Sequence, residues 1–121
     1  GVENLLIARV TEVFDTGFVA KLNEKTIEVA AHAASNETVT LGIRPENVVL
    51  SKSPSASSMR NTFHGKVTDI SPAGIHARVT VDCGFKLIAY ITPHSVNELA
   101  LARGSEISAS FKATAIHVLR H

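Results

Sequence analysis

Polar and apolar residues alternate with a period of two along most of this chain, a pattern that indicates β-strands. The alternation is clearest at residues 74–82, where one face carries the apolar side chains Ile75, Ala77, Val79 and Val81. The opposite face carries the polar side chains His76, Arg78, Thr80 and Asp82. Similar patterns predict strands within residues 18–29, 39–43 and 107–118, separated by turn-forming residues.

The chain also contains an internal repeat. An Asn, three further residues, a small residue, a cation and Val occur twice, as Asn4, Ala8, Arg9 and Val10 and again as Asn61, Gly65, Lys66 and Val67. The two copies also end alike, because residues 43–48 align with residues 111–116. The second copy is longer, with its additional residues at 91–99. Such a repeat predicts two related structural units.

The repeat and a polar linker divide the chain into a first β-barrel copy at residues 1–51, a linker at 52–58 and a second copy at 59–121. Each copy holds about five short strands, which favours a small OB-like barrel. The predicted fold is therefore all-β, with two tandem OB-like five-stranded barrels and a short helix inserted in the second. Neither copy is long enough to be stable on its own, so strand exchange or packing between copies or subunits is expected.

The inserted helix is predicted to begin after Thr92, which is a good N-cap, with Pro93 at the first helical position and Ser95 at the third. The free N–H groups of a helix N-terminus can bind an anion, and two hydroxyls flank this one. The alternative is that Thr92 only caps the helix, and spacing alone favours it.

Two other segments offer hydrogen-bond donors. The first is residues 57–61, which bring hydroxyls, the Arg60 guanidinium and the Asn61 amide without an acid; Arg can hold an oxyanion through two parallel hydrogen bonds. The second is Lys112-Ala113-Thr114, between the last two strands. Taken alone, each segment fits an ordinary solvated loop better than a binding site.

Composition narrows the classes of function. The 121 residues carry a net charge of +1, whereas a duplex DNA binder usually has a larger excess of basic residues. The single cysteine, Cys83, allows no internal disulfide and fits a buried apolar residue in a reducing compartment. The six histidines are scattered and form no recognisable zinc motif. The sequence shows no P-loop, nucleophile elbow, signal peptide or membrane-spanning run.

Taken together in order, several motifs resemble the molybdate-binding Mop (molbindin) domain over residues 58–119. These are Ser58-Met59-Arg60-Asn61, Gly65-Lys66-Val67, Val79-Thr80-Val81-Asp82-x-Gly84, Ile91-Thr92-x-x-Ser95-x-x-x-Leu99 and Lys112-Ala113-Thr114. The first copy, closed by Ile43-Arg44-Pro45-Glu46, resembles the TOBE-type segment of importer ATPases. This order is similar to the C-terminal regulatory region of molybdate/tungstate ABC transporter ATP-binding proteins.

The resemblance implies a tetrahedral oxyanion, molybdate or tungstate, bound at a homodimer interface between barrels. The residues that it implies for the site are Ser58, Met59, Arg60, Asn61, Thr92, Ser95, Lys112 and Ala113, with Met59 and Ala113 acting through backbone N–H groups. The first copy lacks the Ser-x-Arg-Asn and Thr-x-x-Ser elements, so no equivalent site is expected there. Molybdate and tungstate only accept hydrogen bonds at neutral pH, which suits a pocket of donors without carboxylates.

The favoured hypothesis is a regulatory sensor that inhibits further import when the anion is bound. The chain itself would not be an enzyme; ATP would bind an N-terminal domain outside it, and a membrane permease would be the partner of the full-length protein, at the inner face of the cell membrane in the cytoplasm. One alternative is a free-standing molbindin-type storage protein. Another is an OB-like nucleic-acid module, disfavoured because only six residues are aromatic; no nucleic-acid partner is expected.

Overall fold

The computed structural model describes residues 4–53 and 61–119, and within them the protein is almost entirely β. The first copy forms β1 (Asn4–Phe14), β2 (Gly17–Leu22), β3 (Lys25–Val29), β4 (Thr38–Ile43), the 3-10 turn η1 (Pro45–Asn47) and β5 (Val49–Ser51). The second copy forms β6 (Asn61–Ala73), β7 (His76–Asp82), β8 (Lys86–Ile91), α1 (Pro93–Glu98), β9 (Glu106–Phe111), the 3-10 turn η2 (Ala113–Ala115) and β10 (Ile116–Leu119). The predicted fold class is confirmed, including the short helix of the second copy.

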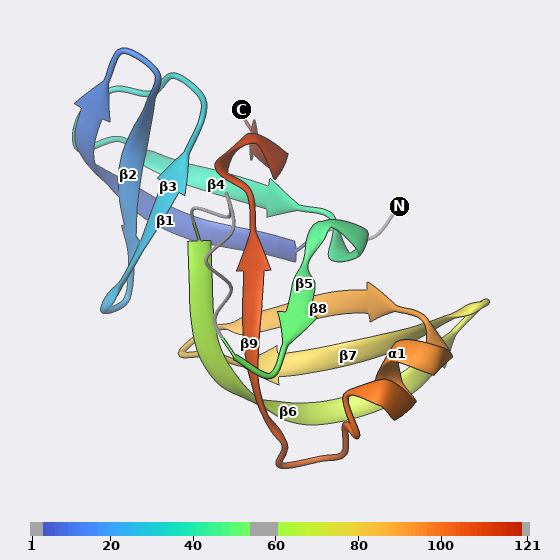
Figure 1. Cartoon of the computed structure of the whole chain (residues 1–121). Helices are drawn as coiled ribbons and strands as arrows, with labels where there is room; N and C mark the ends of the chain where they lie inside the picture. Colours follow the sequence, from blue (N-terminus) through green and yellow to red (C-terminus); the bar gives the residue numbers. More distant parts are fainter. Residues whose placement is uncertain (1–3, 54–60, 120–121) are drawn as a thin grey trace.

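The strands form two five-stranded antiparallel sheets that exchange their last strands. The first sheet has the order β10-β4-β1-β2-β3, and the second has the order β5-β9-β6-β7-β8. In Figure 1, green β5 runs down into the lower sheet, while the red C-terminal end rises to the upper one. Each sheet therefore takes four strands from one copy and one from the other. The predicted linker at 52–58 lies mostly outside the described residues, and the domain boundaries stay a prediction.

The exchanged strands are short but in good register. Strand β10 pairs with β4 from Ile116 opposite Ile43 to Leu119 opposite Thr40. Strand β5 pairs with β9 over three residues, with Leu50 opposite Ala109. Both strands bury apolar side chains, so each copy contributes to the other's core.

One hydrophobic core runs through both sheets. Phe18 and Phe111 are fully buried, and Phe63 stacks on Phe111 with ring centroids 5.8 Å apart. The prediction for Ile75 is wrong: this side chain lies in the β6–β7 turn and is 85% exposed. The alternation of β7 begins only at His76, because the turn occupies the preceding residues.

Gly65 lies where little space is available for a side chain. A Cβ on Gly65 would lie 2.5 Å from the carbonyl oxygen of Asp82 and 2.9 Å from the Cβ of Cys83. The matching position of the first copy holds Ala8. We expect Gly65→Ala to lower the free energy of unfolding by about 1–3 kcal/mol, since the crowding atom is backbone and cannot move aside cheaply. Thermal unfolding of the variant, beside the parent, would contradict this if the two midpoints coincide.

Candidate oxyanion site

The first group of candidate donors lies at η2, where the chain turns between β9 and β10. Lys112 is the N-cap of η2, with φ −77° and ψ 145°, and its side chain is exposed. The carbonyl of Ala113 accepts a hydrogen bond of 3.2 Å from the N–H of Ala30, which fixes η2 against the end of β3. Lys112, Ala113 and Thr114 line a groove together with residues of the first copy.

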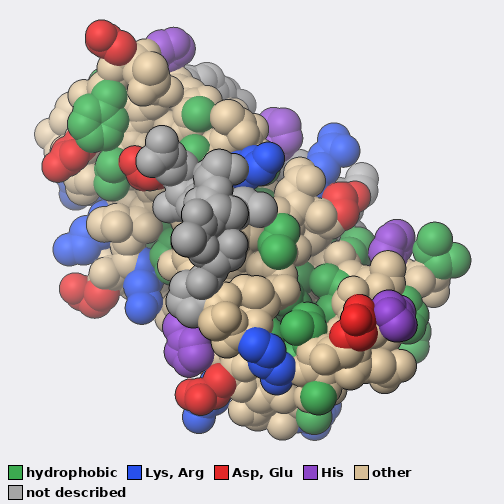
Figure 2. Space-filling view, viewed as in Figure 1, with side chains coloured by type: hydrophobic (Ala, Val, Ile, Leu, Met, Phe, Trp, Pro, Cys, Tyr) green, Lys and Arg blue, Asp and Glu red, His purple; other side chains and the backbone are tan. Residues whose placement is uncertain are grey.

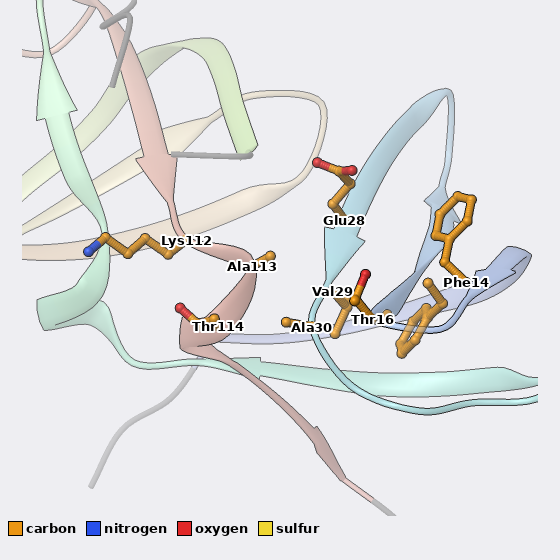
Figure 3. A pocket seen from close by; sticks show the side chains of 10 residues that line it. Phe14, Thr16, Glu28, Val29, Ala30, Lys112, Ala113 and Thr114 are labelled. Atoms are coloured by element: carbon orange, nitrogen blue, oxygen red, sulfur yellow. The ribbon is translucent and has the colours of Figure 1, made fainter. Parts of the chain in front are cut away.

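Glu28 brings a carboxylate to this first groove. It lies on β3, and the groove also includes Val29 and residues of the β1–β2 turn. Figure 3 shows the Lys112 side chain extending away from Glu28, so the ammonium and the carboxylate do not point toward each other. A carboxylate would repel a dianion placed centrally in this groove.

The second group of donors lies at the start of α1. The Oγ1 of Thr92 accepts a hydrogen bond of 3.1 Å from the N–H of Ser95, so Thr92 caps the helix. The Thr92 hydroxyl in turn donates to the Oγ of Ser95 at 3.0 Å. This relay uses the hydroxyl hydrogen of Thr92 and leaves that of Ser95 available to an acceptor outside the helix.

The two groups of donors line different grooves of one chain. Thr92 and Ser95 face η1 and β5 of the first copy, and Glu46 of η1 lines the same groove. Each donor group of the second copy therefore lies against the first copy, which lacks both donor motifs. The sequence did not reveal Glu28 or Glu46 at these places, because their positions follow from strand exchange between the copies.

The remaining candidates lie at or near the start of β6. Ser58, Met59 and Arg60 are outside the described residues. Asn61 is described and buried, at 3% exposure. Its Oδ1 accepts a hydrogen bond of 2.9 Å from the N–H of Glu28, and its Nδ2 donates at 2.9 Å to the carbonyl of Glu28. As an anion ligand Asn61 stays a prediction, with both ends of its carboxamide already engaged.

The copies share the local geometry of their closing turns. Arg44 is the N-cap of η1 with φ −68° and ψ 136°, close to the values for Lys112 at η2. The next two residues differ, because Pro45 and Glu46 stand where the second copy has Ala113 and Thr114. Proline has no N–H to donate and Glu46 adds negative charge, so η1 is a poorer place for an anion than η2.

Metal and thiol chemistry have little support in the described part of the chain. Within it, no three side chains among His, Cys, Asp and Glu are grouped closely enough to hold a metal ion. Cys83 is buried, and burial raises the pKa of its thiol from 9.0 to about 11. The thiol is therefore protonated at neutral pH and is a poor nucleophile.

The raised pKa of Cys83 predicts a loss of stability in alkali. The unfolded chain begins to release this proton near its ordinary pKa of 9.0, while the folded chain holds it until about 11. Between these values the unfolded state binds fewer protons, so the free energy of unfolding falls as the pH rises. Urea unfolding at pH 8, 9 and 10 should show this fall in the parent and a smaller one in Cys83→Ala. Equal slopes in the two proteins would contradict the assignment.

Surface charge is mixed on the face drawn in Figure 2. Lys and Arg side chains alternate there with Asp and Glu rather than gathering into a stripe. Ion pairs among the described residues join exposed side chains, such as Arg103 with Asp69 at 3.2 Å. A groove for a nucleic-acid backbone would instead gather one sign of charge. A separate observation concerns the helices: none that the described residues form has the length and apolarity needed to cross a membrane.

Sequence comparison finds relatives of this chain among import ATP-binding proteins. The TOBE domain family matches residues 57–118, which cover most of the second copy. The chain is 34% identical over 119 residues to the molybdate/tungstate import ATP-binding protein WtpC of Pyrococcus horikoshii, covering 98% of this chain and 32% of the relative. It is 41% identical over 81 residues to WtpC of Pyrococcus abyssi, covering 66% of this chain and 24% of the relative. The chain thus spans about a third or less of these relatives.

Structural comparison supports the fold. The cytoplasmic molybdate-binding protein ModG, in a crystal form with molybdate bound, superimposes with a TM-score of 0.85 at 20% identity. The match covers 95% of this chain and 94% of ModG, so it extends over both sheets.

The comparisons confirm the predicted resemblance to molybdate/tungstate importer ATP-binding proteins and to molbindins. The resemblance of the first copy alone to a TOBE-type segment stays a prediction, since the family match falls on the second copy. The match extends over the second copy, from the linker to the last strand, and the chain therefore belongs to the TOBE domain family.

Proposed function

We propose that this chain is the oxyanion-sensing regulatory domain of a molybdate/tungstate importer ATP-binding protein, and that two chains bind the anion between them. One chain would supply Ser58, Arg60, Lys112 and backbone N–H groups near Met59 and Ala113. Its partner would supply Thr92 and Ser95. Binding requires no catalysis by this domain.

The observation that carries this proposal is the separation of the two donor groups. Lys112 lines the groove against β3, whereas Ser95 lines the groove against η1. Each of these grooves also contains a carboxylate from the first copy, Glu28 or Glu46. Glu98 of the second copy also lines the groove of Ser95. Because the two donor groups line separate grooves of one chain, a single anion that meets both groups needs the second copy of another chain. This is why we place the site between chains.

The donors suit the chemistry of the proposed ligands. Molybdate and tungstate carry two negative charges and accept hydrogen bonds without donating any. Arg60 and Lys112 supply positive charge, and the relay at α1 leaves the hydroxyl hydrogen of Ser95 free to donate. Sulfate has the same charge and shape but is smaller, so discrimination against it would rest on the size of the pocket.

Regulation would follow from the place of the site between chains. An anion that binds one arrangement of two chains more tightly than others shifts the population toward that arrangement. In a full-length importer protein, this shift would hold the ATP-binding parts in a state that does not drive transport. ATP would then bind elsewhere in the longer protein, and the permease would be the partner at the cytoplasmic face of the membrane.

A storage protein of the molbindin type is the second candidate. The likeness to ModG over nearly the whole of both chains favours it. The asymmetry of the copies disfavours it, because a storage protein gains capacity from two complete binding copies. Here η1 carries Pro45 and Glu46 in place of donors.

Calorimetric titration with molybdate, tungstate and sulfate tests the proposal. We expect the two larger anions to bind tightly, sulfate to bind weakly, and Arg60→Ala to lose binding. The titration should be repeated with single-stranded oligonucleotide at modest salt, for which we expect no heat. A folded protein that is silent with all three anions would overturn the oxyanion site, and oligonucleotide binding would revive the nucleic-acid alternative.

A further inference from the structure

The contacts of Asn61 within the chain explain why an asparagine stands at this position, without a role in binding a ligand. It is buried, and its carboxamide forms two hydrogen bonds with the backbone of one residue, Glu28. Glu28 lies on β3, the last strand in the order of the first sheet. The outer N–H and C=O groups of such a strand need partners when buried. The carboxamide supplies both partners, as a neighbouring strand would.

Asn4 does the same at the matching place in the first copy. It is 5% exposed; its Oδ1 accepts a hydrogen bond of 2.7 Å from the N–H of Ile88, and its Nδ2 donates at 2.9 Å to the carbonyl of Ile88. Its Nδ2 also lies 3.1 Å from the carbonyl of Ile43. Ile88 belongs to β8, the last strand in the order of the second sheet. Each copy thus holds the outer strand of the other through one Asn, and we call these four residues the asparagine clamp.

The contact between Asn4 and Ile88 forms although the first copy lacks the donor motifs of the second. The first copy offers no candidate ligand at η1, where it has Pro45 and Glu46. The pairing of Asn with the opposite outer strand therefore does not depend on an anion site. The same pairing by Asn61 needs no anion either.

Asn61 nevertheless lies at the base of the proposed site. It pairs with Phe111 in the β6–β9 ladder, and Phe111 precedes Lys112. In the sequence it directly follows Arg60. Its partner Glu28 lines the same groove as Lys112. A shift of Asn61 would therefore move the backbone that carries Lys112.

From these observations we infer that Asn61 is a positioning residue that docks the second copy onto β3 and holds Lys112 in place, rather than a ligand of the anion. The inference deepens the proposed function and rests on it for the consequence on binding. The clamp itself rests only on the contacts of Asn4 and Asn61.

The clamp can be measured in the parent protein by amide exchange and NMR. Without anion, we expect the Glu28 N–H and the Asn61 side-chain NH2 to be protected from solvent, as the Ile88 N–H is by Asn4. Addition of molybdate should leave the Asn61 side-chain resonances and the Glu28 protection unchanged. If molybdate instead releases the Glu28 N–H and shifts the Asn61 resonances, Asn61 is a ligand and the inference is overturned.

Two matched variants separate positioning from stability. Asn61→Ala removes two hydrogen bonds to Glu28, and Asn4→Ala removes two to Ile88 and one to Ile43. We therefore expect Asn4→Ala to lose at least as much in thermal midpoint as Asn61→Ala. Molybdate affinity should fall roughly 10- to 100-fold in Asn61→Ala, a loss typical of a residue that orients ligands, and change less than about twofold in Asn4→Ala. Unchanged affinity in folded Asn61→Ala, or equal losses in both variants, would contradict the positioning role. A parent that binds no molybdate would defeat the proposed function, whereas the exchange experiment would still decide whether the clamp exists.

Discussion

Lys112→Ala is expected to weaken molybdate binding about 10- to 150-fold, which corresponds to the roughly 1.5–3 kcal/mol typical of a hydrogen bond to a charged group. Lys112 lies exposed at the N-cap of η2, where its side chain extends away from Glu28. Because this side chain is exposed, the variant should fold normally. Calorimetric titration with molybdate measures the loss directly.

Arg44→Ala is the matched control for this prediction. Arg44 occupies the same place in η1 and has nearly the same backbone angles. We expect its removal to leave molybdate affinity within about twofold of the parent, since η1 carries Pro45 and Glu46 in place of anion donors. Equal losses in the two variants would indicate a general effect of positive charge and would contradict a specific role for Lys112.

Removal of residues 116–121 is expected to unfold the first barrel, although these residues end the second copy. The truncation takes away β10, which pairs with β4 over four residues. Burial of a side chain such as Ile116 contributes roughly 1.5–3 kcal/mol, and each lost backbone hydrogen bond about 1 kcal/mol. The total is a large part of the stability of a small domain.

Hydrogen–deuterium exchange locates the effect of this truncation. Protection should fall first in β1 and β4, and less in β6 and β7, which keep their neighbours. A shorter truncation that ends at Leu119 retains all of β10 and serves as the control. Loss of protection confined to the second sheet would contradict the strand exchange.

The sequence predicted the parts of the fold that depend on local pattern. Alternation predicted most of the strands, and the capping residues predicted α1 after Thr92, where the structure has it. Strand exchange was expected only in general terms. The strands that exchange, β5 and β10, have three and four residues, too few to carry a pattern that identifies their partners.

The candidate site was harder to predict because its surroundings depend on tertiary contacts. Motif order predicted which residues supply donors, but it could not show that Glu28 and Glu46 lie in the two grooves. It also could not distinguish an Asn that binds a ligand from one that binds backbone, since both need the same residue type. Only the contacts between Asn61 and Glu28 reveal the second role.

The most direct test of the central claim, that the anion binds between two chains, is complementation in a mixed dimer. One chain carries Lys112→Ala and the other Ser95→Ala, and two different tags allow the mixed dimer to be isolated. Each pure variant should bind molybdate weakly. The mixed dimer has one intact site, with Lys112 from one chain and Ser95 from the other, so calorimetry should show one molybdate bound per dimer with parental affinity. If the mixed dimer binds no better than the pure variants, the two residues do not meet across chains and the account is wrong.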